Sequence, residues 1–218
     1  PSAARVVYEY YGGATRFPDC EAMIEAVDRV DSGQLTREEI LHPTGWVLLG
    51  FLSDPRTGLG RFREFRISNY QLMEELINHC RHMSIHEILA LPDVAERVDL
   101  YLEQARLFED MVREHTEVEG NVIVTDLRDV SPIYAGNRFL IYSLYPGQNV
   151  SVWIVDGRQK QNVAIACGYS VLNRTCAVDV GSLMLRHGGG GHRMVGTCQV
   201  PYGDADLHIR QIVEALKG

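Results

Sequence analysis

The hydrophobic period of this chain changes after Gly120, and that change limits the folds it can adopt. Before it, apolar residues recur every three or four positions, as in amphipathic helices. After it, short β-branched and aromatic runs are separated by turn residues such as Pro146-Gly147 and Asp156-Gly157. We therefore expect an α/β (α+β) fold, mainly helical at first and ending in a mixed β-sheet flanked by helices.

The long segment 92–115 predicts one amphipathic helix with Pro92 in its first turn. Its apolar stripe either packs on its own domain and joins two domains, or forms the seam of a homodimer. We expect three parts: a helical part over 1–91, a linker helix over 92–117 and a sheet domain over 118–218.

Local signals place the remaining elements. In the first part we expect helices over 1–13, 18–31 and 67–83, and short helices at the capping boxes Thr36–Glu39 and Ser84–Glu87. Residues 43–62 predict a buried helix followed by an exposed glycine-rich loop. In the last part we expect strands at 121–127, 139–145, 150–156, 163–170 and 195–201, and helices at 178–187, with Asp179 near its N-cap, and 204–217.

Composition excludes some classes of function. The 218 residues carry a formal net charge of −8, so the chain is not a general DNA binder and would hold nucleotides at a local basic site or through a metal. Its five cysteines form no CxxC pair, which favours reduced thiols in a cytoplasmic protein. No apolar run is long enough to span a bilayer, and no signal peptide is recognisable.

The stretch LRHGGGGHRM, residues 185–194, is the strongest candidate for a binding site. It is neither a Walker loop nor a dinucleotide fingerprint, because no Gly-Lys-Ser/Thr follows and a helix precedes it. Glycines can stop the helix and let a ligand reach bare amides, but the C-terminal end of a helix repels anions. Positive groups must therefore be supplied separately, and the candidates are His192, Arg193 and, from a neighbouring strand, Arg174. Alternatively, the glycines only let a tight turn pack against the sheet.

The segment VDVGSLMLRHGGGGHRMVG resembles the C-terminal signature of the DHH/DHHA1 phosphoesterase superfamily, in its exopolyphosphatase-like or oligoribonuclease-like branch. That signature is a helix beginning with valine and aspartate, followed by Gly-Gly-Gly-His. The preceding VAIACGYSVLNRT resembles the strand that leads to an arginine in that family. The resemblance covers 118–218. Val195-Gly196-Thr197 departs from the usual alanine-rich tail, which affects the fine shape of the site.

The resemblance implies a substrate-binding role for the last part of the chain, the DHHA1 domain. Gly189, Gly190, Gly191 and His192 match the glycine-histidine element, and Arg174 matches the phosphate-binding arginine. In the family, a catalytic DHH domain holds two Mn²⁺ ions. PSAARVVYEYYGG resembles the helix after its Asp-His-His motif. IEAVDRVDSG resembles its fourth motif, which implies a metal ligand at Asp31, with Asp28 as the alternative.

The chain contains no Asp-His-His motif and no Asp-x-Asp near its start. One aspartate cannot hold two divalent ions, so we expect a truncated or proteolysed product that keeps a remnant of the DHH domain and lacks most metal ligands. The intact protein is then expected to be a manganese-dependent hydrolase. Its substrates would be the terminal phosphoester bonds of short single-stranded oligonucleotides, phosphorylated nucleotides or polyphosphate, with no membrane partner.

Two other functions compete with this one. The chain could be a non-catalytic module that binds or senses a nucleotide or nucleic acid, which the missing metal motifs favour. It could also be an RNA-binding domain like those beside tRNA synthetases, but its acidity and helical first part argue against that function.

Two further clusters have ordinary explanations. His79, Cys80, His82 and His86 suggest zinc, yet the capping box at Ser84 places a helix boundary among them. The stretch SDPRTGLGRFREFR gathers Arg56, Arg61, Arg63 and Arg66 around Phe62 and Phe65. It predicts a solvated loop that packs on its own domain or, alternatively, a contact with a nucleic-acid strand or a partner domain. Whether Arg138 faces a ligand is left open.

Overall fold

The computed structural model describes residues 2–61 and 65–217, so Phe62 and Arg63 lie outside the described residues. The chain forms two compact units. Unit 1 comprises Pro1–Phe108 and Tyr134–Leu140, and unit 2 comprises Glu109–Ile133 and Ile141–Gly218. The boundary falls within the long helix. The assignment of 1–91, 92–117 and 118–218 to family domains stays a prediction.

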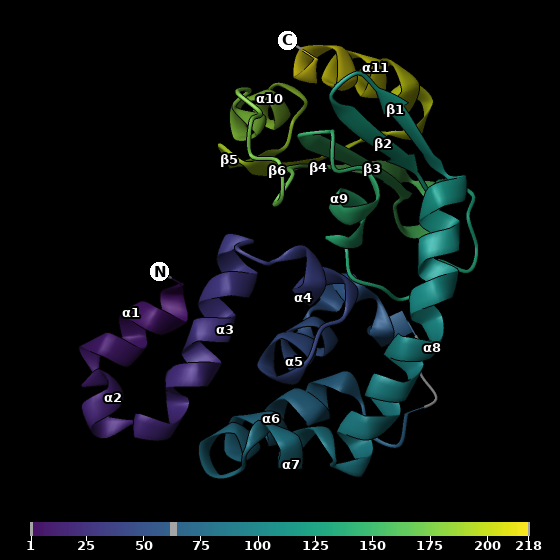
Figure 1. Ribbon diagram of the computed structural model, residues 1–218. Helices are drawn as coiled ribbons and strands as arrows, with labels where there is room; N and C mark the ends of the chain where they lie inside the picture. The colour runs from purple at the N-terminus through teal and green to yellow at the C-terminus, as the bar shows by residue number, and fades with distance from the viewer. Residues whose placement is uncertain (1, 62–64, 218) are drawn as a thin grey trace. The chain divides into compact units, whose positions relative to one another are not determined.

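The described residues of unit 1 form helices and turns (Figure 1). Three capping boxes fix helix starts, because Thr36, Ser68 and Ser84 each exchange hydrogen bonds with the residue three positions later. The helices are α1 (Ala3–Tyr10), α2 (Gly13–Arg16), α3 (Glu21–Ser32), α4 (Arg37–Leu41), α5 (Gly45–Ser53), α6 (Asn69–His82), α7 (Ile85–Leu89) and α8 (Pro92–Glu114), with 3₁₀ turns η1 (Pro18–Cys20), η2 (Pro55–Thr57) and η3 (Leu59–Arg61).

The apolar helix α5 lies in the core of unit 1. Five of its nine residues are buried, and it packs with buried residues of α6, α7 and α8. A helix that is apolar on all sides has to be buried, so the predicted buried helix is confirmed. The loop after it is not fully exposed, contrary to the prediction. Leu59 joins the core, and the buried Thr57 hydroxyl donates to the Phe51 carbonyl at 2.6 Å.

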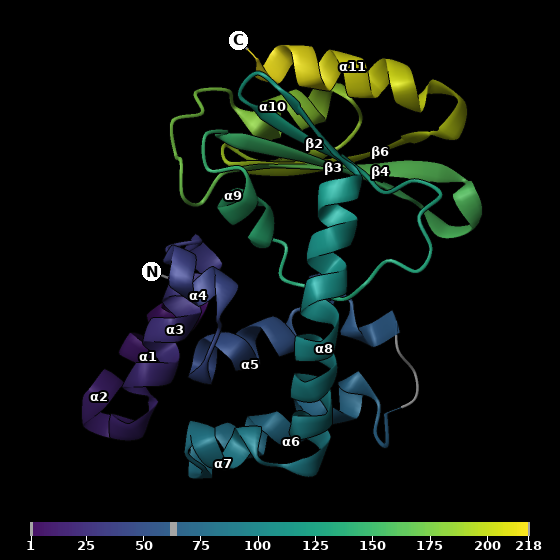
Figure 2. The same ribbon diagram turned by 45° about the vertical axis from the view of Figure 1, so that its right-hand side comes forward.

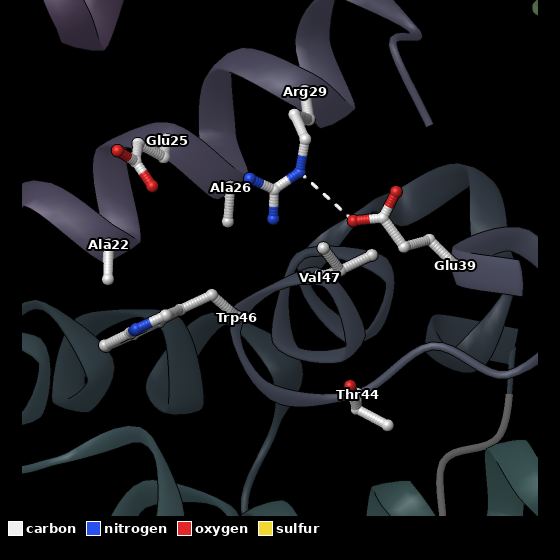
Figure 3. Close-up of a pocket in the computed structure, with 8 residues that line it drawn as sticks. All are labelled: Ala22, Glu25, Ala26, Arg29, Glu39, Thr44, Trp46 and Val47. Carbon is white, nitrogen blue, oxygen red and sulfur yellow. Dashed lines mark hydrogen bonds and ion pairs between the residues drawn. The ribbon is translucent and has the colours of Figure 1, made fainter. Parts of the chain in front are cut away.

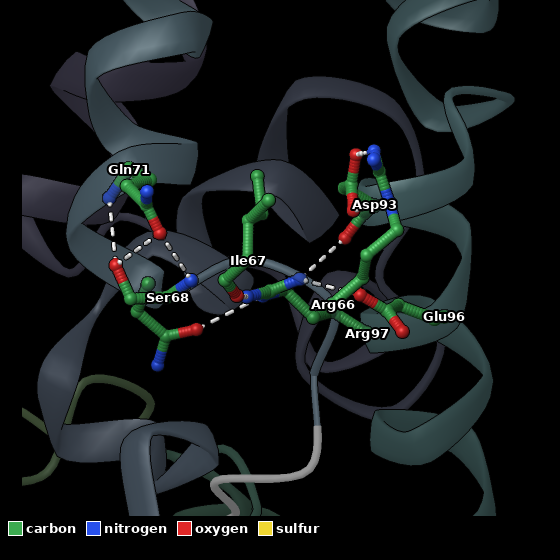
Figure 4. A network of polar contacts seen from close by, with 8 residues as sticks. Arg66, Ile67, Ser68, Gln71, Asp93, Glu96 and Arg97 are labelled. Atoms are coloured by element: carbon green, nitrogen blue, oxygen red, sulfur yellow. Dashed lines mark hydrogen bonds and ion pairs between the residues drawn. The ribbon is translucent and has the colours of Figure 1, made fainter.

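A buried arginine fixes the start of α8 (Figure 4). The Arg97 side chain is 1% exposed. Its guanidinium donates to the Ile67 and Asp93 carbonyls, each at 2.7 Å, and to the side chains of Asn69 and Glu96. The ring of Phe65 lies 3.9 Å from its central carbon. Because the guanidinium is well paired, its burial holds α8 to the segment before α6.

The short segment Tyr134–Leu140 returns to unit 1 through buried hydrogen bonds. Ala135 N donates to the Gln104 side chain at 2.7 Å, and Gly136 N donates to the Thr57 carbonyl at 2.9 Å. The side-chain amide of Asn137 donates to the Ile40 carbonyl. These bonds satisfy a buried backbone that belongs to no sheet.

Unit 2 contains a mixed six-stranded sheet in the order β1-β2-β3-β4-β6-β5. β2 and β3 are parallel, and the other neighbours are antiparallel. Helices α10 (Val180–Arg186) and α11 (Ala205–Leu216) cover one face, and α9 (Leu140–Leu144) lies on the other (Figures 1 and 2). The strands are β1 (Thr116–Glu119), β2 (Val122–Asp126), β3 (Val150–Asp156), β4 (Asn162–Tyr169), β5 (Gly190–His192) and β6 (Val195–Pro201), and η4 (Arg158–Lys160) and η5 (Tyr202–Asp204) are 3₁₀ turns.

The core of unit 2 follows the alternation of its strands. Val152, Ile165 and Val200 belong to the residues that point to one face, where they pack with Leu183 of α10 and Ile212 of α11. This arrangement confirms the predicted α+β class and the mixed sheet flanked by helices.

Three local predictions in unit 2 were wrong. Residues 139–145 were expected to form a strand, but most of them form the short helix α9, and β1 and β5 were not expected. Residues 139–143 are all buried, so they show no amphipathic period that separates a helix from a strand. The Asn137 side chain accepts from Phe139 N at 2.9 Å and begins the helical turn.

The apolar stripe of α8 is buried within the chain. Val94, Tyr101, Phe108 and Val112 are each at most 6% exposed. This burial favours packing on the chain itself over a dimer seam built from that stripe. All five cysteines are free thiols. Within the described ranges, no helix is both long and apolar enough to cross a membrane.

Candidate functional site

The glycine run begins by ending helix α10. Asp179 caps the start of this helix, as predicted, by accepting from Ser182 N at 2.9 Å. At its end Gly188 has φ +77° and its N–H donates to the Leu185 carbonyl, while Gly189 N donates to the Met184 carbonyl at 2.9 Å. This is a Schellman motif. The amides of Gly188 and Gly189 are therefore used by the helix end.

Two glycines of the run allow close packing. A Cβ on Gly189 would overlap the Thr197 carbonyl and lie 2.6 Å from Cys198 Cα. A Cβ on Gly191, which has φ +154°, would overlap the Val195 carbonyl. By contrast, nothing lies within 4 Å of a Cβ on Gly190. Space for a ligand therefore exists at Gly190. Gly189 and Gly191 fit the alternative interpretation, in which glycines let a tight turn pack against the sheet.

The run does not remain a loop, as the sequence had suggested. Gly190–His192 pair with β6 as the edge strand β5. The following turn is fixed to two neighbours, since Val180 N donates to the Arg193 carbonyl at 3.0 Å and Tyr169 N donates to the Met194 carbonyl at 2.9 Å. The turn that follows His192 is thus held by both α10 and β4.

His192 is exposed in this fixed turn. Its Nδ1 accepts a long hydrogen bond of 3.4 Å from Met194 N. An accepting Nδ1 places the proton of a neutral imidazole on Nε2. The ring therefore presents an N–H donor, which suits a phosphate oxygen.

Arg174 is also exposed, in the segment that follows β4. Its Nε donates to the Val171 carbonyl at 3.3 Å. The segment is fixed by Ser170, whose hydroxyl accepts from Asn173 N at 2.9 Å. Because the end of β4 bonds the β5–β6 turn, Arg174 and His192 both leave the sheet at that end. A guanidinium and an imidazole N–H are the donor types that bind phosphate.

A histidine pair that the sequence did not indicate lies at the end of α10. His187 Nδ1 and His208 Nδ1 are 2.8 Å apart, so one ring donates to the other and joins α10 to α11. Desolvation, followed by the charges of His208 and Arg186, lowers the pKa of His187. The two residues are 21 positions apart, so no local spacing predicts the pair.

The predicted metal ligands lie on α3. Asp31 is exposed in its last turn. Asp28 accepts from Ser2 N and from Arg5 Nε, each at 2.8 Å, and these hydrogen bonds lower its pKa to about 2. Asp28 thus has a structural role, because it joins α1 to α3.

Within residues 2–61 and 65–217, no three His, Cys, Asp or Glu side chains are grouped to hold a metal ion. These residues do not fit a two-metal centre by themselves. His82 is the last residue of α6, and His86 belongs to α7. The boundary expected from the capping box therefore separates these two histidines.

A surface hollow of about 230 Å³ lies between α3 and the start of α5 (Figure 3). Trp46 forms one side of it, and the Arg29–Glu39 ion pair, at 3.1 Å, crosses another. A helix turns by roughly 100° per residue, so Asp31 lies about 200° around α3 from Arg29. The hollow therefore does not include the predicted metal ligand.

Comparison with known proteins identifies the family. No protein-family model and no curated protein matches the chain. Among solved structures, it is similar to the pGpG-specific phosphodiesterase PggH from Vibrio cholerae, with 51% sequence identity and a TM-score of 0.85, over 99% of this chain and 73% of that one.

Two other solved structures are more distant from this chain in sequence and in fold. The C-Ala domain of Aquifex aeolicus alanyl-tRNA synthetase is 18% identical, with a TM-score of 0.31, over 47% of this chain and 98% of that one. A DHH domain described as a member of the S1P family of ribosomal proteins is 12% identical, with a TM-score of 0.45, over 78% and 41%. From its 51% identity to the phosphodiesterase, over nearly its whole length, the chain belongs to the DHH/DHHA1 phosphoesterase superfamily.

Proposed function

We propose that this protein is a hydrolase that cleaves short 5′-phosphorylated oligonucleotides, with linear dinucleotides as the preferred length. The observation that carries the proposal is the 51% identity to a pGpG-specific phosphodiesterase over 99% of the chain. The exposed donors at one end of the sheet in unit 2 support it, since phosphate is the group common to all such substrates.

In this proposal, unit 2 holds a substrate phosphate. Arg174 supplies a guanidinium fork, and His192 supplies the Nε2–H donor. Gly190 leaves space for the phosphate to approach the backbone. The amides of Gly188 and Gly189 do not take part, because they bond carbonyls of α10. Side chains therefore provide most of the positive charge, as the negative end of a helix requires.

Manganese dependence is part of the same proposal and rests on the family resemblance. A bound divalent ion supplies Lewis-acid chemistry and a nucleophilic water. Asp31, with Asp28 as the alternative, is the proposed contribution of the described residues to such a centre. No catalytic step is derived through the metal, because the described residues do not form its site.

The test combines binding and turnover. Isothermal titration would measure the affinity for 5′-phosphorylated diguanylate and for AMP, and chromatography would measure Mn²⁺-dependent release of mononucleotide. We expect Arg174→Ala and His192→Ala each to weaken binding about tenfold. Arg158→Ala is the matched control, because it removes an exposed charge at the opposite end of β3 and β4.

Each outcome separates two functions. Binding that depends on Arg174 and His192, together with turnover, supports the hydrolase. Binding without turnover at saturating Mn²⁺ supports the alternative of a sensing module. Equal losses of affinity in Arg158→Ala and Arg174→Ala would rule out the proposed phosphate site.

A further inference from the structure

One face of helix α3 combines small and charged side chains. The positions i, i+3, i+4 and i+7, which lie on one side of a helix, are occupied by Ala22, Glu25, Ala26 and Arg29. All four line the surface hollow of about 230 Å³ between α3 and the start of α5. The two alanines leave space in front of the helix, and the two charged side chains lie at the edge of that space (Figure 3).

The ion pair between Arg29 and Glu39 orients the guanidinium. Arg29 Nε donates to Glu39 Oε1 at 3.1 Å. Glu39 is itself fixed, because its Oε2 accepts from Thr36 N at 2.9 Å in the capping box. The two terminal nitrogens of Arg29 have no partner among the described residues, and its side chain is 39% exposed. They therefore form a donor pair whose direction is set by the ion pair.

Glu25 supplies a carboxylate with no bonding partner in the part of the chain that the structure describes. It lies four positions before Arg29, the spacing at which a glutamate and an arginine usually pair on a helix. Arg29 binds Glu39 instead, so Glu25 stays exposed. One edge of the hollow therefore presents an acceptor pair beside a donor pair, on side chains whose Cβ atoms are about 5–6 Å apart at this spacing.

The opposite side of the hollow is aromatic. Trp46, in the first turn of α5, faces the space that Ala22 and Ala26 leave (Figure 3). It is only partly buried, although Val47 beside it is buried. An indole with an accessible face offers a plane on which a flat ring can stack. The volume of about 230 Å³ lies below the roughly 300–1,000 Å³ of pockets for drug-sized ligands, so the hollow suits a single base.

A ligand that fits this hollow is flat and carries two donors next to two acceptors on its edge. Guanine has such an edge, because its N1–H and 2-amino group can donate to a carboxylate, while O6 and N7 can accept from a guanidinium. In adenine, an unprotonated N1 would face the carboxylate and the amino group would face the guanidinium. We propose that the hollow binds a guanine base, with Glu25 and Arg29 at its edge, Trp46 stacked on its face and Glu39 as the residue that positions Arg29.

The base has two sources, an oligonucleotide substrate or a released nucleotide. Either source rests on the proposed function, whereas binding of the base itself does not. All residues of the hollow belong to unit 1, so the inference is independent of the site at Arg174 and His192.

Guanosine tests the site, because it has no phosphate for Arg174 or His192 to bind. The chain has two tryptophans, so Trp153→Phe leaves Trp46 as the only one. In this variant we expect guanosine to quench the fluorescence of Trp46 saturably, and adenosine to bind about tenfold more weakly. Titration calorimetry of the unsubstituted protein repeats the comparison, so the test does not depend on the folding of the variant.

Glu25→Gln replaces one acceptor oxygen by a donor. It should weaken guanosine binding about tenfold and leave adenosine binding unchanged. Glu74→Gln is the matched control, because Glu74 is an exposed glutamate of α6 in the same unit. A loss confined to Glu25→Gln supports the site. Absence of saturable binding, equal affinity for the two nucleosides, or equal effects of the two variants would overturn it.

Turnover assays identify the source of the base and separate this inference from the proposed function. If Glu25→Gln raises KM for 5′-phosphorylated diguanylate and not for diadenylate, the oligonucleotide supplies the base. If Glu25→Gln weakens only guanosine binding, a released nucleotide supplies it. If the dinucleotide is neither bound nor cleaved, the proposed function fails, and guanosine binding alone decides the hollow. If the dinucleotide is cleaved and guanosine is not bound, the function stands and this inference fails.

Discussion

Units 1 and 2 position their helices by different means. In unit 1, buried or half-buried charges join the elements, as Arg97 does for α8 and as Arg5 does between Asp28 and Glu21. In unit 2, strand pairing sets the positions, and α10 lies against the sheet through glycine contacts. A Cβ on Gly181 would come within 2.8 Å of the Gly191 backbone.

The difference follows from backbone hydrogen bonding. A helix satisfies its own backbone and gains no directional bond to a neighbour, so short helices need side chains to fix their arrangement. A strand obtains its hydrogen bonds from its neighbours, so the sheet fixes its own spacing. The stability of unit 1 should therefore be sensitive to the loss of charged side chains. The stability of unit 2 should be sensitive to added side-chain volume.

The largest expected effect is from Arg97→Met. It keeps much of the side-chain volume but leaves the Ile67 and Asp93 carbonyls without their buried donor. We expect the free energy of unfolding to fall by about 3–5 kcal/mol, as when one partner of a buried polar network is lost. Urea denaturation followed by circular dichroism measures it. Arg113→Ala, which removes an exposed ion pair with Glu109, should cost at most about 0.5 kcal/mol. Equal losses of unfolding free energy in Arg97→Met and Arg113→Ala would contradict the role given to buried charges in unit 1.

A smaller effect is expected from Gly189→Ala in unit 2. Its methyl group would overlap the Thr197 carbonyl, so β6 would have to move, at a cost of about 1–3 kcal/mol in the free energy of unfolding. Gly190→Ala is the matched control, because its methyl group meets nothing within 4 Å. Thermal denaturation of the two variants measures the difference. Similar melting temperatures of Gly189→Ala and Gly190→Ala would mean that the turn tolerates a methyl group at Gly189.

Acid should release α1 from α3 before it unfolds the remainder of unit 1. The pKa of Asp28 is lowered from 3.8 to about 2 by bonds from Ser2 and Arg5, so the folded state favours the ionised carboxylate. Its contribution to stability is present above about pH 4 and is lost as the pH falls towards 2. Hydrogen exchange of α1 amides against pH measures this. Asp28→Asn should expose α1 at all pH values, whereas Glu9→Gln should not. Unchanged protection in Asp28→Asn would show that apolar packing holds α1.

The smallest effect concerns the histidine pair of unit 2. Burial lowers the pKa of His187, so the unfolded chain binds its proton more readily than the folded chain. Stability should therefore decrease as the pH falls through the ordinary histidine range near 6.5. Urea denaturation at pH 7.5 and 5.5 measures the decrease, which His187→Gln should reduce. If the pH dependence of stability is unchanged in His187→Gln, it arises from titratable groups other than His187.

The sequence predicted much of this protein from local chemistry. The capping boxes at Thr36 and Ser84, the buried α5 and the N-cap at Asp179 are confirmed. The glycine-histidine element pointed to the family that the comparison shows. Such signals involve residues a few positions apart, so no distant partner is needed to recognise them.

The tertiary structure decided what depends on distant partners. The composition of residues 139–145 predicted a strand, yet most of them form α9, whose first turn is begun by the Asn137 side chain. The bonds from Ser2 and Arg5 to Asp28 join residues that lie 26 and 23 positions apart, so local spacing did not indicate them. Arg138 reached Asp54 across 84 positions. Periodicity reports which residues share a face, but the partner of a buried charge is set by the three-dimensional path of the chain, since a buried charge has to find an opposite charge wherever the fold places one.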